Sequence, residues 1–471
     1  MKRVYILGAG PTGLALAQQL AETAPDLSVI VVERSQSLGG LAQTLEWPGR
    51  GFHDLGPHKI FTLDQKLWQK VRGLLPASDW LTRPKNSRIY LGGTFLPYPP
   101  SPFALAKVFG PVAFARMVYG FAKSRLLRRE GLPTFEGDLQ ARVGDALYEI
   151  LFLPIAQKLW GDPATLDEKL SQGRVQTPAL SEVILRTLRI RRTSAFEALK
   201  FDYPRNGLSR LWDSIRLRCG EKIEFRTNTE VRFIEFDQGQ ARRLATKSKT
   251  GDDVIEIDSG DFIFSTLPIM RLLDSCRGVP EKIVTLARET VVLNDLILAF
   301  VNLDVNELFA DSWIFVPDPK VSFHRISEQK SFDPGMTPHG TIVCCELMSN
   351  PTRNLASWTD SALEQLVVED LRAMAGKPFG VQAIKIIRLP ASYPVYRTGF
   401  TPKLKQVMDH LDSIENFRSI GRAGAFNYIG TLDCMDIGYG AGRWFLSDYS
   451  RGKAETWRTE RLRTSHYPVL D

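Results

Sequence analysis

A glycine-rich segment near the start of the chain has the residue types and the spacing that bind a diphosphate. Residues 8–13 read Gly8-Ala9-Gly10-Pro11-Thr12-Gly13, a G-x-G-x-x-G arrangement. Gly8 permits a tight turn, Gly10 leaves room for a pyrophosphate against the backbone, and Gly13 allows close packing of helix on strand. A following helix would add free N–H groups and the positive end of its dipole. We therefore predict that this segment, including Pro11 and Thr12, binds a dinucleotide.

An acidic residue follows at the distance that a bound ribose requires. Glu33 lies 20 residues after Gly13, where an acidic side chain accepts hydrogen bonds from ribose hydroxyls in dinucleotide-binding folds. The alternative interpretation is a glycine-rich turn of a doubly wound fold that holds no nucleotide.

The surrounding pattern predicts the elements that position these residues. Residues 3–7 form a short apolar and β-branched run, and residues 28–33 form another. Residues 12–23 between them have helical periodicity, which ends before Pro25. Such a strand–helix–strand unit predicts two parallel strands joined by a crossover helix, with the glycines at the turn into the helix.

The residues after the second strand resemble one superfamily of flavoproteins. Glu33-Arg34 is followed by Gly39-Gly40-Leu41. This Glu-Arg-x4-Gly-Gly pattern resembles the second fingerprint of the FAD-dependent amine oxidase and protoporphyrinogen oxidase superfamily. The resemblance implies FAD as the cofactor and places these five residues beside it.

Two later segments match the same superfamily. Residues 228–231, which we expect in a strand, imply a backbone contact of Val231 with adenine. Gly421-Arg422-Ala423-Gly424 resembles the final FAD motif. Covalent attachment is not expected, because the flavin-binding cysteine of monoamine oxidases has no clear counterpart near Cys434. The FAD should therefore be non-covalent.

Within that superfamily, several short stretches resemble UDP-galactopyranose mutase, and they occur in the same order. They are Gly56-Pro57-His58 with Thr62 and Trp68, then Thr134-Phe135-Glu136 through Tyr148-Glu149 to Lys158-Leu159-Trp160-Gly161, then residues 325–332, and finally residues 421–428. In that family the reduced flavin attacks the anomeric carbon of a sugar nucleotide, while the protein holds the diphosphate.

The mutase resemblance implies a set of site residues. His58 would lie beside the flavin, Arg325 would face both flavin and substrate phosphate, and Tyr428 would bind phosphate. Each also has a structural interpretation: His58 as a loop residue bonded to backbone, Arg325 as a salt-bridge partner, and Tyr428 as a packed core aromatic. The candidate substrate-binding residues are Arg174, Asn427 and Trp160. Trp160 has the alternative of simple packing.

The sequence also departs from the mutase pattern. Asn427 stands where bacterial mutases have Arg, and residues 428–436 resemble the endings of related oxidases and desaturases. Three functions therefore remain open. The first is a flavoenzyme acting on a nucleotide-sugar or glycoconjugate-type substrate. The second is an FAD-dependent oxidase or desaturase of the amine oxidase or protoporphyrinogen oxidase type. The third is a flavin-binding protein without catalysis.

We predict an α/β fold with three parts and a tail. A discontinuous Rossmann-like FAD domain of the GR2 type, with a parallel sheet, should comprise residues 1–60, 200–280 and 415–450. A mixed-sheet substrate domain should comprise 61–100 and 281–414, and a mostly helical insertion 101–199. Strands are expected at 223–236, 261–267, 290–303, 341–347 and 383–388, helices at 134–150, 181–200 and 360–374, and a solvated helix or arm within the tail 451–471.

Composition narrows the choice of partners. The 471 residues carry a net charge of +7 and 44% apolar residues, which favours a globular enzyme with a small-molecule substrate and does not favour nucleic-acid binding. Five cysteines without a CxxC pair favour a reduced, cytoplasmic protein, and no metal site is expected. No apolar run approaches the length of a membrane span.

One segment has a different charge pattern. Residues 101–129 read as two helices broken at Gly110-Pro111, with six basic residues and no acidic one. A solvated helix face is one interpretation. Peripheral contact with the inner face of a membrane, or with a lipid-linked substrate, is the other. The oligomeric state does not follow from the sequence.

Overall fold

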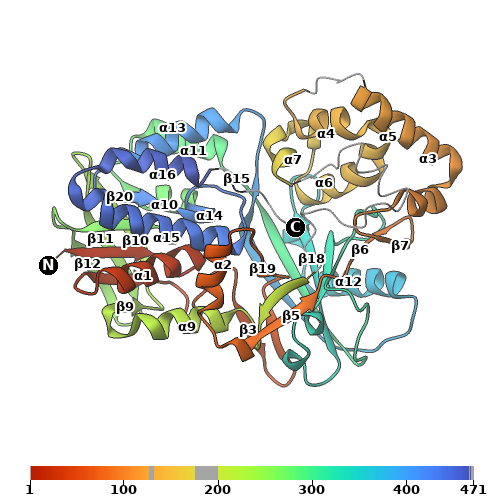
Figure 1. Cartoon of the computed structure of the whole chain (residues 1–471), viewed down its shortest axis with the longest axis horizontal. Helices are drawn as coiled ribbons and strands as arrows, with labels where there is room; N and C mark the ends of the chain where they lie inside the picture. Colours follow the sequence, from red (N-terminus) through yellow and green to blue (C-terminus); the bar gives the residue numbers. More distant parts are fainter. Residues whose placement is uncertain (1, 127–131, 175–199, 466, 468–471) are drawn as a thin grey trace.

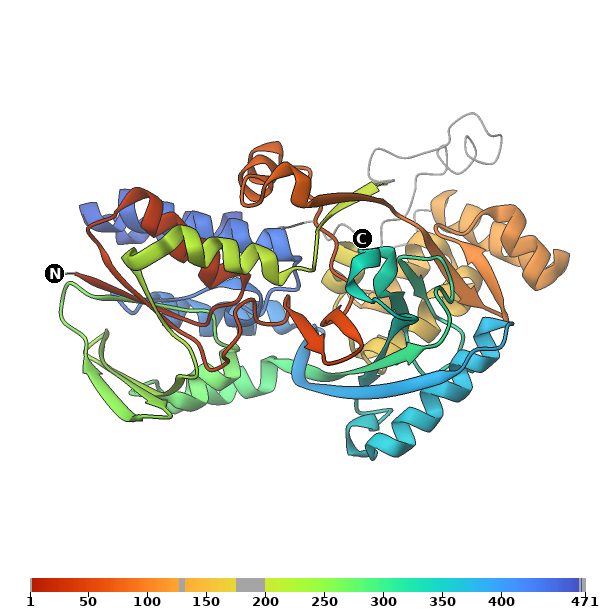
Figure 2. The same cartoon turned by 90° about the horizontal axis from the view of Figure 1, so that it is seen from below.

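The computed structural model describes residues 2–126, 132–174, 200–465 and 467. The chain forms two lobes that lie side by side (Figures 1 and 2). One lobe is built on a parallel sheet and contains the N-terminal strand. The other is built on a larger mixed sheet and bears a group of helices. The predicted α/β fold with a parallel sheet, a mixed sheet and a helical part is confirmed.

The parallel sheet has five strands drawn from distant parts of the chain. In spatial order they are β20 (Phe417–Ser419), β13 (Phe262–Ser265), β1 (Arg3–Leu7), β2 (Ser28–Val32) and β9 (Ile223–Arg226). Every neighbouring pair is parallel. The predicted strand–helix–strand unit is β1, α1 (Pro11–Thr23) and β2.

The alternation of side chains along β1 explains why this sheet is covered on both faces. The side chains of Val4 and Ile6 pack into a core on one face of the sheet. Those of Tyr5 and Leu7 pack into a second core on the opposite face. All four side chains are buried. A continuous apolar run is typical of such a doubly covered strand.

Helices lie on one face of this sheet, and a smaller sheet with further helices lies on the other (Figure 1). The first layer comprises α1, α9 (Ser209–Cys219) and α15 (Thr431–Ser447). The second comprises the sheet β12 (Gly251–Glu256), β11 (Gln240–Ser248), β10 (Glu230–Asp237) and β14 (Cys276–Arg277), with α10 (Ile269–Ser275), α11 (Glu281–Thr290) and α13 (Phe400–Asp412).

The second lobe contains a seven-stranded sheet. Its order is β19 (Val381–Val395), β15 (Val292–Leu303), β18 (Thr341–Ser349), β17 (Arg325–Glu328), β16 (Trp313–Phe315), β6 (Ser87–Leu91) and β7 (Thr94–Pro97). Only the β16–β6 pair is parallel. Helix α12 (Asp360–Ala375) packs on one face of this sheet.

Helices between β7 and β8 form the outer part of the second lobe (Figure 1). In the described part of this span they are α3 (Pro102–Leu126), α4 (Phe135–Val143), α5 (Asp145–Leu147), α6 (Leu153–Leu159) and α7 (Glu168–Arg174), with a π-helical turn at Tyr148–Phe152. α3 is kinked at Gly110, whose φ is 81°, directly before Pro111, as the sequence predicted. The predicted helix 181–200 lies outside the described residues except for Lys200.

Three further pieces connect the lobes. A hairpin consists of β3 (Thr44–Trp47) and β4 (Gly51–Asp54), and it is followed by α2 (Gln65–Arg72). A two-stranded pair joins β5 (Trp80–Pro84) to β8 (Lys200–Pro204). The remaining α14 (Gly421–Gly424) and α16 (Trp457–Arg463) belong to the C-terminal part of the chain.

Two predicted elements are divided in the structure. The single strand expected at 223–236 is β9 and β10, separated by a turn in which Asn228 has a φ of 52°. Residues 228 and 229 therefore lie in that turn, and only residues 230 and 231 of the expected stretch are in a strand. The helix expected at 134–150 is interrupted at Gly144, whose φ of 82° no regular helix contains. Left-handed backbone in both places overrides the apolar periodicity.

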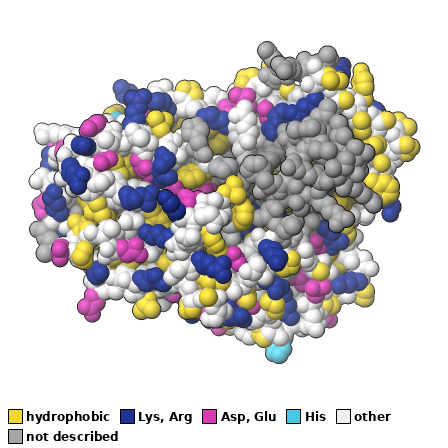
Figure 3. Space-filling model, viewed as in Figure 1, with side chains coloured by type: hydrophobic (Ala, Val, Ile, Leu, Met, Phe, Trp, Pro, Cys, Tyr) yellow, Lys and Arg dark blue, Asp and Glu magenta, His cyan; other side chains and the backbone are white. Residues whose placement is uncertain are grey.

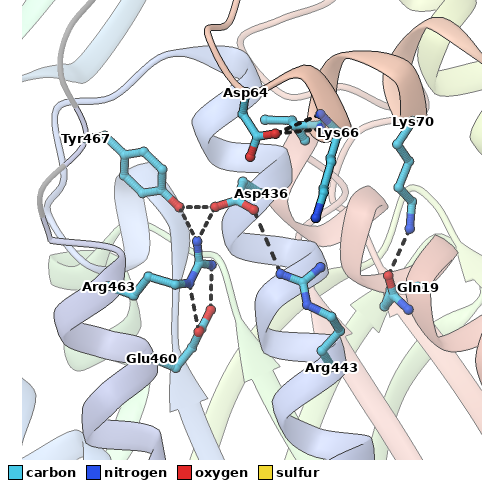
Figure 4. A network of polar contacts seen from close by, with 10 residues as sticks. Gln19, Asp64, Lys66, Lys70, Asp436, Arg443, Glu460, Arg463 and Tyr467 are labelled. Atoms are coloured by element: carbon cyan, nitrogen blue, oxygen red, sulfur yellow. Dashed lines mark hydrogen bonds and ion pairs between the residues drawn. The ribbon is translucent and has the colours of Figure 1, made fainter.

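The predicted terminal helix is present as α16, but one of its faces is packed against the protein and is not solvated. Trp457 is buried and packs edge-on against Trp444 of α15, with ring centroids 4.8 Å apart. Arg463 forms an ion pair with Asp436 of α15 and with Glu460 on its own helix, and Tyr467 donates a hydrogen bond to Asp436 (Figure 4). Arg463 thus helps to fix α16, because Asp436 of α15 lies opposite it.

The boundaries between the two lobes lie at other residues than the sequence predicted. Helices α11 and α13 contribute to the core beneath the parallel sheet. Both fall inside the range 281–414 that the sequence assigned to the substrate domain. The apolar face of each helix packs in the core beneath the parallel sheet, so the chain crosses between the lobes near residues 291 and 396.

Candidate functional site

The turn between β1 and α1 has the geometry of a phosphate loop. Gly8 has a φ of +102°, and a Cβ on Gly13 would lie 2.0 Å from the Gly8 carbonyl oxygen. Only glycine fits at these two positions. A Cβ on Gly10 would have no atom within 4 Å, so this residue faces open space. The missing side chain at Gly10 leaves room that a ligand can occupy.

The first turn of α1 leaves its N–H groups without an internal acceptor. Gly10 is the N-cap and offers no side-chain cap, Pro11 is in the first turn, and no acidic residue lies in that turn. The peptide groups and the helix dipole therefore favour an anion at this end. Thr12 is buried beneath the C-terminal motif, since a Cβ on Gly421 would lie 2.7 Å from its Oγ1.

The second glycine pair folds back onto this turn. The Gly39 N–H donates to the Ala9 carbonyl at 2.8 Å, and a Cβ on Gly40 would lie 3.3 Å from the Gly10 Cα. Both glycines have positive φ. Gly39-Gly40 therefore forms a second wall of the same loop. Arg34 and Leu41 are exposed at its rim.

Glu33 is fixed where a ribose would lie. Its Oε2 accepts from the Ala9 N–H at 2.8 Å and its Oε1 from the Ser35 N–H at 2.9 Å. Each carboxylate oxygen has a second lone pair left for a ligand hydroxyl. The Thr229 N–H donates to the Glu33 carbonyl at 2.9 Å, so the turn before β10 lies beside Glu33 and brings half-buried Val231 to this end of the site.

These residues fit a bound dinucleotide. An open position at Gly10, an uncapped helix N-terminus, a glycine pair against the turn and an oriented carboxylate would hold pyrophosphate and adenosine ribose. Gly421 and Arg422 approach from the opposite end, at the start of α14. The fit extends beyond a minimal phosphate loop, because residues 39–40 and 421 both contact it.

His58 lies where the two lobes meet. Its Nδ1 is 3.0 Å from the Gly56 carbonyl. A carbonyl can only accept, so Nδ1 bears the proton and Nε2 is an acceptor. Burial lowers the pKa of His58 to about 4, and the positive charges of Arg325 on one lobe and Arg422 on the other add to the shift. The imidazole is therefore neutral near pH 7.

Arg325 forms a bidentate ion pair across the sheet. Arg325 on β17 and Glu346 on β18 are directly opposite in the strand register. The Arg325 Nε donates to Oε1 at 2.6 Å and Nη2 donates to Oε2 at 2.9 Å. Glu346 is buried, and a Cβ on Gly56 would lie 3.8 Å from its Oε2. The segment that bears His58 thus passes over this ion pair.

Arg422 and Tyr428 form a second contact near His58. The guanidinium of Arg422 lies over the Tyr428 ring, 4.9 Å from its centroid, and its Nη1 donates to the Ile429 carbonyl at 2.6 Å. The Tyr428 N–H donates to the Tyr396 hydroxyl at 2.8 Å. The structure therefore brings together the predicted residues His58, Arg325, Arg422 and Tyr428.

The other predicted substrate residues lie differently. Asn427 donates from Nδ2 to the Thr464 carbonyl at 3.2 Å, so it contacts the C-terminal segment. Trp160 is buried against Phe135 in the core of the helical group. Arg174 is the last residue of α7, and its side chain is outside the described part. Asn427 and Trp160 thus have structural contacts, and so do His58, Arg325 and Tyr428.

Two residues were missed from the sequence. Glu346 is the single charged residue of the strand Thr341–Ser349, and a lone carboxylate in a buried run is the signal that would have found it. Lys158 in the quoted Lys-Leu-Trp-Gly stretch is buried, and its Nζ donates to the carbonyls of Val316 and Asp318 at 2.6 Å and of Phe323 at 3.2 Å. This ammonium ties α6 to the seven-stranded sheet.

The fold and this loop define a dinucleotide-binding protein of the Rossmann-like class. A family model described as NAD(P)-binding Rossmann-like domain matches residues 6–74. A coproporphyrinogen III oxidase of Staphylococcus aureus (strain NCTC 8325 / PS 47) is 22% identical over 465 residues, which cover 93% of this chain and 97% of that protein.

Two solved structures share the fold over nearly the whole chain. A reduced UDP-galactopyranose mutase superposes with a TM-score of 0.81 at 19% identity, covering 100% of this chain and 98% of that one. A putative protoporphyrinogen oxidase from Exiguobacterium sp. 255-15 superposes with a TM-score of 0.70 at 19% identity, covering 94% and 98%. The resemblance to the FAD-dependent amine oxidase and protoporphyrinogen oxidase superfamily is confirmed, and so is the prediction of a flavoenzyme with FAD as its cofactor.

Proposed function

We propose that this flavoenzyme acts on a nucleotide-sugar or glycoconjugate-type substrate, in the manner of a mutase. The observation that carries the proposal is the charge at the junction of the lobes. Arg325 and Arg422 both act on neutral His58, while Glu346 is the carboxylate paired with Arg325. Two guanidinium groups against one carboxylate leave a positive site, which favours a diphosphate.

Each residue has a defined task in this proposal. Bound FAD supplies an electron-rich ring when reduced and a hydride acceptor when oxidised. Arg325 and Arg422 bind the substrate anion. Tyr428, held under the Arg422 guanidinium, positions that cation. Nε2 of neutral His58 accepts one hydrogen bond from a ligand hydroxyl or N–H, because its Nδ1–H is already donated to Gly56.

A specific observation favours the second candidate, an oxidase or desaturase. Glu346 already takes two of the N–H groups of Arg325, and Asn427 contacts the C-terminal segment. Both reduce the capacity to bind phosphate. The near-complete overlap with the Staphylococcus aureus coproporphyrinogen III oxidase supports the same candidate.

One experiment separates the two candidates. UDP and UDP-galactose are titrated anaerobically into the oxidised and the photoreduced holoprotein while the flavin spectrum is recorded, and products are analysed for pyranose–furanose conversion. We expect a saturable spectral change and conversion only with reduced flavin. Absence of any response in either redox state would overturn the mutase proposal. Oxygen consumption with a porphyrinogen or an amine would then support the oxidase.

A further inference from the structure

Helix α3 presents large apolar side chains to solvent. Val112, Tyr119 and Leu126 are 74%, 69% and 76% exposed, and Phe103 in the first segment of the helix is 80% exposed. Hydrophobic side chains gather at the right-hand edge of the molecule in Figure 3, where Figure 1 places α3. Large apolar residues exposed together mark an interaction surface more often than residues scattered singly.

The exposed residues form one stripe. Val112, Tyr119 and Leu126 are separated by seven residues each, or nearly two turns of helix. Ala115 lies on the same face, and Val112, Ala115 and Tyr119 line a shallow surface hollow together with Pro111 and Arg116. The stripe is therefore continuous along the second segment of α3.

Cations border this stripe, and α3 contains no Asp or Glu. Arg116 and Lys123, again seven residues apart, are exposed and lie next to the stripe. Arg125 lies farther around the helix and is half-buried, with its guanidinium 5.5 Å from the Phe121 ring centroid. Lys107 is exposed on the first segment. An apolar strip between long basic side chains suits the boundary of an anionic bilayer, where the cations reach the phosphates and the strip enters the acyl region.

By length and composition α3 is also apolar enough to span a membrane, contrary to the expectation that no apolar run approaches that length. The folded protein cannot adopt that arrangement, because the opposite face of α3 is packed against the protein. Leu105 and Met117 are buried in a core with β6 and β7, and Gly110-Pro111 divides the helix. The helix is thus held on the second lobe by one face, and only the other face is available.

We propose that the outer face of α3 docks the protein on an anionic lipid bilayer, with the helix in the plane of the interface. Val112, Tyr119 and Leu126 enter the apolar boundary, and Arg116 and Lys123 bind lipid phosphates. The surface is built from residues apart from the His58–Arg325 site, and its test needs no substrate. Failure of this proposal is therefore distinguishable from failure of the proposed function.

The test is flotation of the FAD-loaded protein with vesicles at low salt, using phosphatidylcholine alone or mixed equally with phosphatidylglycerol. We expect the wild type to float with the mixed vesicles. Replacing Arg116 and Lys123 by Gln should weaken this partitioning about thirty-fold, since each cation near an anionic surface contributes about five-fold. A double change of Val112 and Leu126 to Ser should abolish flotation.

A matched control uses exposed apolar residues of the other lobe. Leu217 and Val254 are 83% and 53% exposed, and their double change to Ser should leave flotation unchanged. Flavin content and far-ultraviolet circular dichroism verify folding of each variant. The proposal would be overturned if the wild-type protein floated no more with the mixed vesicles than with vesicles of phosphatidylcholine alone. It would also be overturned if the Arg116/Lys123 and Val112/Leu126 variants floated as well as the wild type does. A wild-type dimer that the Val112 and Leu126 changes abolish would instead assign the stripe to contact between two copies of the chain.

Discussion

Arg325 and Glu346 lie directly opposite each other on antiparallel strands and are joined by two hydrogen bonds, Nε to Oε1 at 2.6 Å and Nη2 to Oε2 at 2.9 Å. This pair fixes the guanidinium in a plane beside His58. The role of Arg325 separates the two candidate functions. It either binds substrate phosphate, as a mutase requires, or serves only as the structural partner of the buried Glu346 carboxylate.

Arg325→Lys tests which role the cation has. A lysine keeps the charge but not the planar fork. In the proposed mutase-like function we expect FAD binding and folding to persist while UDP affinity in the reduced state falls about 10- to 100-fold, which corresponds to the loss of one charge-assisted hydrogen bond. Spectral titration measures this affinity.

Arg88→Lys is the matched control for that experiment. Arg88, on β6 of the same sheet, forms a similar multidentate pair with Asp311, which precedes β16. It is not among the groups that act on His58. Its change to Lys should leave UDP binding unaltered. Equal losses in the two variants would assign the effect to sheet stability and contradict a role for Arg325 in binding.

Glu33→Ala should weaken retention of FAD. The Glu33 carboxylate is held by the N–H groups of Ala9 and Ser35, and loss of its charge-assisted bonds to ribose hydroxyls costs about 1.5–3 kcal/mol. Reconstitution of apoprotein with FAD, followed by flavin fluorescence, gives the dissociation constant. Glu136→Ala, on α4 of the other lobe, should bind FAD as wild type does, and an equal loss there would contradict the assignment of Glu33.

The nucleotide site was predictable from sequence because local rules determine it. Gly8, Gly10 and Gly13 act through backbone geometry within one turn, and the apolar runs on either side have no alternative to a buried parallel strand. Convergence of Gly39-Gly40 and Gly421 on this turn was predicted only through resemblance, since residues so far apart in sequence are brought together by packing.

Other features of the fold and the site depend on contacts between distant residues, which the sequence does not reveal. Glu346 was missed because its importance comes from the residue opposite it on another strand, Arg325. The division of 223–236 follows from the left-handed backbone of Asn228, which lies between Thr227 and Thr229 and ends the first strand. The tail was expected in solvent because its charges suggested hydration, whereas Asp436 and Asp412 provide carboxylates for Arg463 and Arg461.

Trp457→Ala tests whether the C-terminal helix stabilises the FAD lobe. Trp457 is buried against Trp444, and the guanidiniums of Arg418 and Arg461 lie over its ring. Removing a buried tryptophan typically costs about 3–5 kcal/mol. We expect a loss of that size in the free energy of unfolding, measured with urea. Trp358→Ala provides the comparison, because that ring is 44% exposed. A similar loss at Trp358 would contradict specific packing by α16.

Acid should destabilise the protein through His324. Its ring is buried, and the Glu346 backbone offsets only part of the cost of charging it. Burial lowers the pKa of His324 well below its ordinary value of 6.5, and the charges of Arg325, Lys158 and Arg353 add to this. The folded state therefore binds fewer protons than the unfolded state below about pH 6.5, so stability is complete above that pH and falls as pH decreases.

His324→Phe should remove this part of the pH dependence. Between pH 6.5 and pH 5 one such histidine contributes about 2 kcal/mol, and the variant should lose that much less stability than the wild type over this range. Urea unfolding at pH 7, 6 and 5 measures the difference. His339→Phe, at an exposed histidine, is the matched control, and we expect it to keep the wild-type slope. If His324→Phe also retains that slope, the acid sensitivity arises from His53 and His58, whose pKa values are lowered to about 4.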